Sequence, residues 1–147
     1  SPNNAFEATF SRGNVFRRNR ACFSNFGFWL GFSTDTVLEE NLITDNRFDG
    51  VHWEHGARGL LRNNLIARNG RYGVAFTLNP ANRDFPDRCV STSHELRDNH
   101  FVSNGQCAVY LLHTTGTRLE GNRYRAERQP WRIDGASAEN MLLDVFL

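Results

Sequence analysis

Residues that can transfer protons or bind anions recur at a nearly constant spacing along this chain. Glu7, Trp29 and His52 are separated by 22 or 23 residues, and Tyr110 precedes Arg132 by 22 residues. A histidine or tyrosine can remove a proton next to a carboxylate, and an arginine can stabilise the anion that results. We therefore expect His52 or Tyr110 to act as the base and Arg132 to act as the cation.

A second set of polar residues lies two positions after the first and includes Glu54, Thr77 and Asp134. Aromatic faces stack on sugar rings, whereas carboxylates and arginines bind hydroxyls and uronate carboxylates. Together the two sets predict a saccharide site. Its predicted catalytic residues are His52, Glu54, Tyr110 and Arg132, and its predicted substrate-binding residues are Glu7, Trp29, Thr77 and Asp134.

The same residues allow a second interpretation, in which they have no catalytic role. His52 and Glu54 can be solvated side chains on an exposed face, and Trp29 can simply pack against its neighbours. Catalysis needs several titratable groups on adjacent repeats, yet Ala75 interrupts the first set. A structural or interaction module of a larger secreted protein therefore stays open as the alternative function.

The elements that position these residues follow from an internal repeat. A leading asparagine begins each repeat, at Asn19, Asn41, Asn64, Asn99 and Asn122. The intervals are 22, 23, 35 and 23 residues. We interpret the long interval as an ordinary repeat plus an inserted loop at Asn79–Ser93, because this segment is rich in Pro, Asn, Asp and Ser.

Apolar residues keep the same register as the asparagines. One apolar column contains Phe16, Leu38, Leu61, Leu96 and Leu119, and three others run beside it. Within each repeat the apolar residues alternate with variable ones, which is the periodicity of strands and not of helices. Successive turns of such strands stack about 4.8 Å apart, and a corner asparagine can bond to the asparagine of the next turn.

The sequence therefore predicts an all-β fold, a parallel solenoid of about six turns with 22–23 residues per turn. We expect a single domain over residues 1–147, with the predicted saccharide site as a strip along one outer face. Residues 1–5 show no amphipathic helix that would plug the first turn, and the apolar stretch at 141–147 ends abruptly, so we expect part of a longer solenoid, or end-to-end packing with further turns or a second subunit. A cap formed by residues 131–147 is the alternative.

The repeat resembles that of a known family. Asn41-Leu-Ile-Thr-Asp-Asn46, followed by Gly50-Val-His-Trp53, is similar to the right-handed parallel β-helix repeat of pectin-lyase-like proteins, and above all to its Asn-rich branch. That branch includes mannuronan epimerases and periplasmic copper-maturation β-helix proteins. The resemblance implies binding of an acidic polysaccharide, lyase or epimerase activity if the chain is catalytic, and a secreted or periplasmic location. It allows calcium as a cofactor, although no residue pattern here requires one.

Composition excludes several other classes. The formal net charge is +1, which gives no overall field for nucleic acid or an anionic membrane, and no apolar run reaches the length of a membrane span. Cys22, Cys89 and Cys107 lack metal-type spacing, and our register places Cys22 too far from Cys107 for a disulfide. His55 and His113 lie two turns apart and are poor co-ligands, so we predict no metal site.

Overall fold

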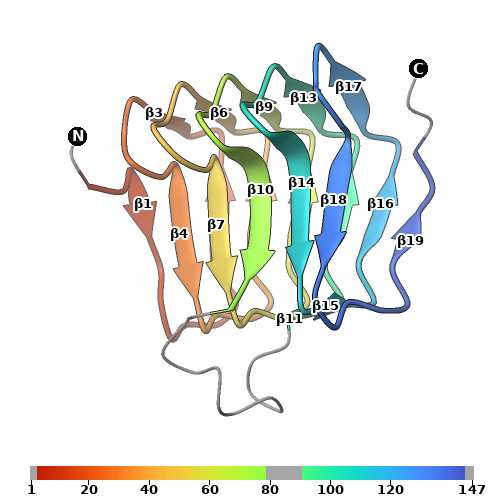
Figure 1. The fold of residues 1–147 in the computed structure, drawn as a ribbon. Coiled ribbons are helices and arrows are strands. Elements are labelled where there is room, and N and C mark those ends of the chain that lie inside the picture. Colours follow the sequence, from red (N-terminus) through yellow and green to blue (C-terminus); the bar gives the residue numbers. More distant parts are fainter. Residues whose placement is uncertain (1–2, 79–90, 145–147) are drawn as a thin grey trace.

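The structure is a computed structural model that describes residues 3–78 and 91–144. All regular secondary structure in these two ranges is β-strand, and the chain coils so that each turn adds one parallel strand to each face of a solenoid (Figure 1). Within these ranges, two faces carry six strands and the third carries five. The predicted all-β parallel solenoid of about six turns is therefore confirmed.

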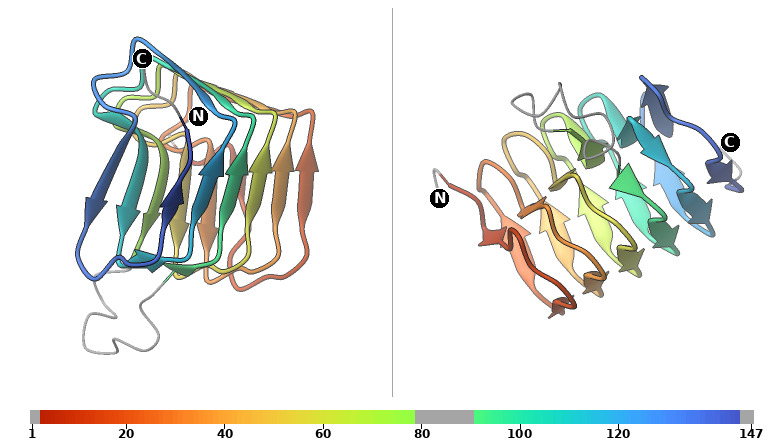
Figure 2. Two further views of the ribbon diagram at one scale, coloured as in Figure 1. Left: turned by 90° about the vertical axis from the view of Figure 1, so that its right-hand side faces the viewer. Right: turned by 90° about the horizontal axis from the view of Figure 1, so that it is seen from below.

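Each face of the solenoid is one parallel sheet. The first sheet contains β1 (Phe6–Glu7), β4 (Phe28–Gly31), β7 (Val51–Glu54), β10 (Tyr72–Thr77), β14 (Cys107–Leu112) and β18 (Trp131–Asp134). The second contains β2 (Val15–Arg17), β5 (Val37–Glu39), β8 (Leu60–Arg62), β12 (Glu95–Arg97), β16 (Arg118–Glu120) and β19 (Met141–Leu142). The third contains β3 (Arg20–Cys22), β6 (Leu42–Thr44), β9 (Leu65–Ala67), β13 (His100–Val102) and β17 (Arg123–Arg125). Figure 2 shows the three faces from the side and from below.

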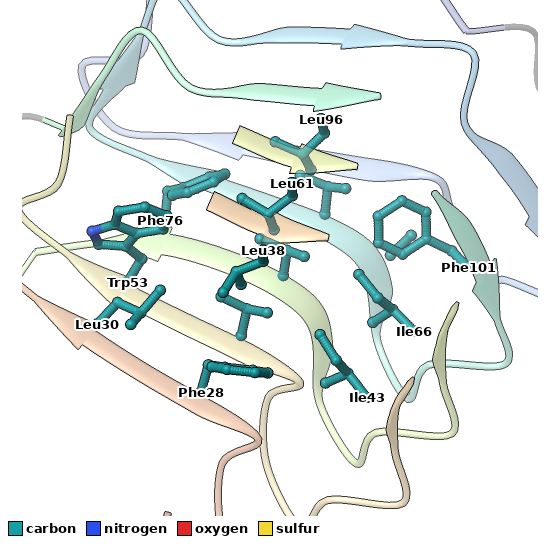
Figure 3. Close-up of a cluster of buried hydrophobic side chains, with 14 of the residues drawn as sticks. Phe28, Leu30, Leu38, Ile43, Trp53, Leu61, Ile66, Phe76, Leu96 and Phe101 are labelled. Carbon is teal, nitrogen blue, oxygen red and sulfur yellow. The ribbon is translucent and has the colours of Figure 1, made fainter. Parts of the chain in front are cut away.

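The predicted strand registers are confirmed. Leu38 pairs with Leu61, which in turn pairs with Leu96, so the predicted apolar column runs straight through the second sheet. The core is formed by such inward columns from all three sheets, with Trp53 and Phe76 among its largest fully buried side chains (Figure 3). Because every inward position is apolar in almost every turn, the hydrophobic core is continuous along the axis.

Buried asparagines occupy the corners on either side of the third sheet. Asn64 Oδ1 accepts hydrogen bonds from the backbone N–H of Asn41 (2.9 Å) and from its side-chain amide (3.1 Å). Asn64 Nδ2 in turn donates to Asn99 Oδ1 (2.9 Å), so the three asparagines lie in one file. The residues before them have positive φ values, 55° at Glu40 and 53° at Asp98. This sharp bend turns the backbone N–H of each leading asparagine away from strand pairing, and the side-chain oxygen of the asparagine in the next turn accepts it.

The predicted insert at 79–93 lies largely outside the described residues, which resume at Ser91. Ser91–Thr92 forms β11, which pairs with β15 (Thr114–Thr115), so the C-terminal end of the predicted insert belongs to the solenoid. Cys89 also lies outside the described residues. Cys22 and Cys107 are free thiols.

Within the described ranges, no helix has the length and apolarity needed to cross a bilayer.

The first turn of the solenoid leaves apolar side chains exposed. Phe10, Val15 and Phe23 are exposed over 79%, 63% and 67% of their surface. Packing of the solenoid against further turns or a second subunit stays a prediction.

Candidate functional site

The predicted strip lies on the outer face of the first sheet, in the predicted register. The strand pairs place Glu7 beside Trp29, Trp29 beside His52, Ala75 between His52 and Tyr110, and Tyr110 beside Arg132. Gly31, Glu54 and Thr77 are likewise in register, as are Leu112 and Asp134. Residues of different turns are thus neighbours along the axis, as the repeat predicted.

A pocket of about 190 Å³ opens on this face at strand β10. It is lined by Asp49, His52, Arg71, Tyr72, Ala75, Thr77 and Tyr110. Strands β7, β10 and β14 lie side by side here (Figure 1). We call this cavity the Ala75 pocket.

The pocket exists because β10 carries small outward side chains between two strands with large ones. Ala75 faces out between His52 of β7 and Tyr110 of β14. Adjacent strands are about 4.8 Å apart, so the two flanking residues are separated by about 10 Å of sheet. The interruption at Ala75, which counted against a continuous strip in the sequence, is what leaves room for a ligand.

Asp49 organises the charged wall of the pocket. Its side chain is fully buried, and its two oxygens accept bonds from Arg71 Nε and Nη2, both at 2.8 Å. Oδ2 also lies 2.8 Å from His52 Nδ1, and Oδ1 accepts the backbone N–H of Tyr72 at 3.3 Å. Burial alone would raise the pKa of Asp49, but the hydrogen bonds from Arg71 and His52 outweigh it and lower the pKa below its ordinary value.

His52 is held between two carboxylates. Its Nδ1 bonds to Asp49, and its Nε2 lies 3.2 Å from Glu54 Oε1. Burial opposes protonation, yet the bonds to Asp49 and Glu54 raise the pKa of His52 above its ordinary value. The ring also stacks on Trp29 with centroids 4.4 Å apart. Because both ring nitrogens are bonded to carboxylates, neither nitrogen is free to remove a proton from a ligand.

The opposite wall is built from two tyrosines. Tyr72 and Tyr110 stack with ring centroids 4.6 Å apart, and Tyr110 donates its hydroxyl to Asp134 at 3.0 Å. Asp134 also accepts from Arg132 Nε at 2.9 Å, and the Arg132 guanidinium lies 5.5 Å from the Tyr110 ring centroid. Burial, together with the bond to Asp134, raises the pKa of Tyr110 to about 12. The phenolate that a tyrosine base requires is therefore disfavoured at neutral pH.

The structure brings only some of the predicted site residues into the pocket. His52, Thr77 and Tyr110 line it. Glu54, Trp29 and Asp134 do not line the pocket, but each contacts His52 or Tyr110, which do.

Glu7 and Arg132 do not line the pocket. Glu7 is exposed in the first turn and accepts a bond from Asn4 at 3.2 Å. Arg132 is exposed and paired with Asp134. The expectation that His52 and Glu54 are solvated is wrong, since they are only 9% and 7% exposed.

Sequence reasoning missed Asp49, Arg71 and Tyr72. Asp49 and Arg71 lie in the corners just before β7 and β10, and Tyr72 is the first residue of β10; all three lie outside the alternating runs on which the prediction was based. A signal for two of them was present: Asp49 and Tyr72 each precede a glycine that starts a run, Gly50 and Gly73. The cation at the pocket is therefore Arg71 and not the predicted Arg132.

The donor set around the pocket does not suit calcium. Ca²⁺ takes six to eight oxygen ligands in general, but the oxygens of Asp49 are bonded to Arg71 and His52, and Glu54 is bonded to His52. In the described part of the chain, no group of three or more His, Cys, Asp or Glu side chains is placed to hold a metal ion. His55 stacks on Phe32 at 4.5 Å, and His113 accepts the Ala136 N–H at 2.9 Å.

Three parallel sheets built from the strands of successive turns, an apolar interior and buried corner asparagines define a parallel β-helix. The chain belongs to the family described as "Right handed beta helix region", whose model matches residues 2–124. A solved structure with the same fold is an alginate lyase from Paenibacillus sp. str. FPU-7, with a TM-score of 0.62 and 14% sequence identity. The similarity covers 74% of this chain and 40% of the lyase, so this chain spans less than half of that protein. The comparison with curated proteins found no match.

Proposed function

We propose that this chain is a carbohydrate-binding β-helix module that takes an acidic polysaccharide into the Ala75 pocket. The observation that carries the proposal is the pocket itself: a cavity of about 190 Å³ that combines two tyrosines, an arginine and a histidine on the outer face of one sheet. Aromatic rings pack against sugar rings, and the arginine can bind a uronate carboxylate through paired hydrogen bonds. The alginate lyase with the same fold acts on a polysaccharide of this class and supports the choice of ligand.

Binding is favoured over catalysis by the state of the two expected bases. Elimination or epimerisation at a uronate removes the proton next to the carboxylate, which needs a basic group within reach. His52 has both ring nitrogens bonded to carboxylates, and the pKa of Tyr110 is raised to about 12. We therefore propose a module that binds without cleaving, and lyase or epimerase activity is the second candidate.

The proposal includes a location outside the cytoplasm. Acidic polysaccharides of the alginate and pectate kind are polymers of cell surfaces and walls, so a module that binds them acts in the periplasm or after secretion. The predicted alternative, a structural module of a larger secreted protein, differs in one respect that can be measured: it needs no glycan.

Affinity electrophoresis tests the proposal directly. The protein is run through gels that contain alginate, pectate, a glycosaminoglycan or neutral dextran, and absorbance at 235 nm follows unsaturated products in parallel solutions. We expect retardation by at least one acidic polysaccharide, no retardation by dextran and no rise in absorbance. If none of the acidic polymers retards the protein, the binding proposal is wrong and the structural module is the function that remains. A steady rise in absorbance would favour lyase activity.

A pair of substitutions ties the binding to the pocket. Ala75→Trp places a large ring in the column that carries Trp29, His52 and Tyr110 in other turns, and this ring should fill the pocket. Glu7→Trp adds the same ring in the same column, away from the pocket, and serves as the matched control. We expect at least a tenfold loss of affinity for Ala75→Trp and an unchanged affinity for Glu7→Trp. Equal affinities in the two variants would show that the glycan binds elsewhere.

A further inference from the structure

We infer that the glycan site continues from the Ala75 pocket onto Arg47 and Phe48 in the neighbouring corner, where Arg47 binds a second uronate unit of the same chain. The inference rests on the proposed function and adds to it a residue that determines the length and the charge of the ligand. It concerns the connection between β6 and β7, which the predicted strip did not include. Three observations carry it: the contact between this corner and the pocket, the balance of charge in the pocket, and the exposure of Arg47.

Phe48 connects the corner to the pocket. The guanidinium of Arg71, which lines the pocket, lies 5.7 Å from the Phe48 ring centroid, and the guanidinium of Arg47 lies 5.1 Å from the same centroid. The sum of these two distances, about 10.8 Å, is therefore the upper limit on the separation of the two guanidinium carbons. The backbone N–H of Arg71 also donates to the carbonyl oxygen of Phe48 at 2.9 Å, so these residues are direct neighbours in adjacent turns. A short oligosaccharide held at Arg71 can thus reach Arg47.

The pocket does not enclose its ligand. Arg71, Tyr72 and Thr77 line it and are each only partly buried, so a bound chain can continue beyond it. Beside Arg71 the surface is aromatic, because Phe26 and Phe48 lie with ring centroids 5.3 Å apart and the Arg71 guanidinium is within 5.9 Å of both centroids. Both phenyl rings belong to partly buried residues, which leaves ring surface against which a sugar can pack.

The pocket by itself has no excess of positive charge. Arg71 makes two hydrogen bonds to Asp49, and His52 lies between Asp49 and Glu54. Whether His52 is protonated or neutral, the two carboxylates therefore equal or outnumber the positive charges. Attraction of an acidic chain needs a further cation close to the pocket.

Arg47 meets this requirement. It is exposed and forms no ion pair with any residue that the structure describes, whereas Arg68 and Arg71 in the next turn are each bound to an aspartate. Its guanidinium donors are therefore available to bind a carboxylate through paired hydrogen bonds. The cation–π contact with Phe48 restricts the guanidinium before the ligand arrives, which lowers the entropic cost of binding.

Calorimetry on the intact chain compares a free uronate monomer with linear oligomers of two, three and four units, prepared from an acidic polysaccharide that retards the protein in the gels. The affinity should rise by about tenfold or more once the oligomer reaches from Arg71 to Arg47, because the second contact is made by a ligand that is already bound. Arg47→Gln should lower the affinity for the tetramer by about tenfold and leave that for the monomer unchanged. It should also weaken the salt dependence of tetramer binding, since salt screens an exposed charge.

Arg125→Gln is the matched control. Arg125 is likewise exposed and without an ion pair among the described residues, but it lies on β17 in the third sheet. Its replacement removes the same charge and should leave tetramer binding unchanged. Equal affinities for monomer and tetramer, or equal losses in the two variants, would overturn the second contact and leave binding in the pocket intact. Absence of binding to every oligomer and polymer would overturn the proposed function as well.

Discussion

Asp49 is the buried centre of the candidate site, and its replacement by asparagine is the sharpest test of how the site is held together. The side chain is fully buried and bonds at 2.8 Å to both Arg71 and His52. Asparagine has the same shape but no charge, and its amide nitrogen cannot accept from a guanidinium. Asp49→Asn therefore leaves Arg71 and His52 without the carboxylate that they share.

The expected loss follows from the burial of the pair. Removing one member of a buried ion pair costs about 3–5 kcal/mol, and the 37% exposure of Arg71 allows water to replace part of the interaction, so we expect about 2–3 kcal/mol. Such a loss is large against a typical domain stability of about 5–15 kcal/mol. The same change should lower the pKa of His52, because the first of its two stabilising carboxylates is gone.

A matched control lies in the same connection, between β6 and β7. Asp45 binds Arg68 with the same two-bond geometry, at 2.8 and 2.9 Å, but these side chains are 27% and 59% exposed. Asp45→Asn should therefore change the free energy of unfolding very little, since exposed ion pairs contribute little.

Urea unfolding followed by circular dichroism measures both variants, and an NMR titration of the imidazole follows His52. The pKa of Asp49 is lowered in the folded state, so its stabilisation is present above the ordinary value of 3.8 and is lost as the pH falls through the lowered pKa. The difference between wild type and Asp49→Asn should shrink accordingly on acidification. Equal losses for Asp49→Asn and Asp45→Asn would refute the reasoning.

Three further predictions concern the pH dependence, the corner and the core. The pKa of His52 is raised, so the stability that its protonation contributes is complete below the ordinary value of 6.5 and is lost as the pH rises through the raised pKa. His52→Gln should therefore remove this fall in the free energy of unfolding, measured by urea unfolding at several pH values. Asn64→Ala leaves the buried N–H of Asn41 unpaired and removes three other hydrogen bonds, so the free energy of unfolding in urea should fall by about 2–4 kcal/mol. Asn19→Ala, at the start of the column, should lower it much less. Leu61→Ala should cost about 2–5 kcal/mol by the same assay because its side chain is fully buried, and a smaller loss than for an exposed position would contradict the core assignment.

The fold was predictable from the sequence because a stacked solenoid makes local demands that recur in every turn. Leu38, Leu61 and Leu96 must each fill the same layer of the core, and Asn41 and Asn64 must each satisfy the same bent corner. Parallel pairing fixes the register once one residue of each turn is placed. Spacing alone therefore located the strands, the core and the outward strip.

Within the candidate site, spacing predicted which residues are neighbours but not what they do. His52 was correctly aligned beside Ala75, yet its burial and its bonds to Asp49 and Glu54 depend on side chains from the corner and the strand together. Arg71 was missed because its role depends on the direction of a long side chain that leaves the corner, and a residue period carries no information about that direction.

The sequence by itself determined a β-helix of stacked turns with an apolar interior, because backbone pairing forces equivalent residues of successive turns into the same position. Only the tertiary structure decided where a ligand can bind. A small residue such as Ala75 becomes a pocket floor only when the side chains of His52 and Tyr110 stand beside it and those of Arg71 and Tyr72 also line the cavity. Those relations depend on side-chain volume, rotamer and shared hydrogen bonds in three dimensions, which a repeat pattern does not specify.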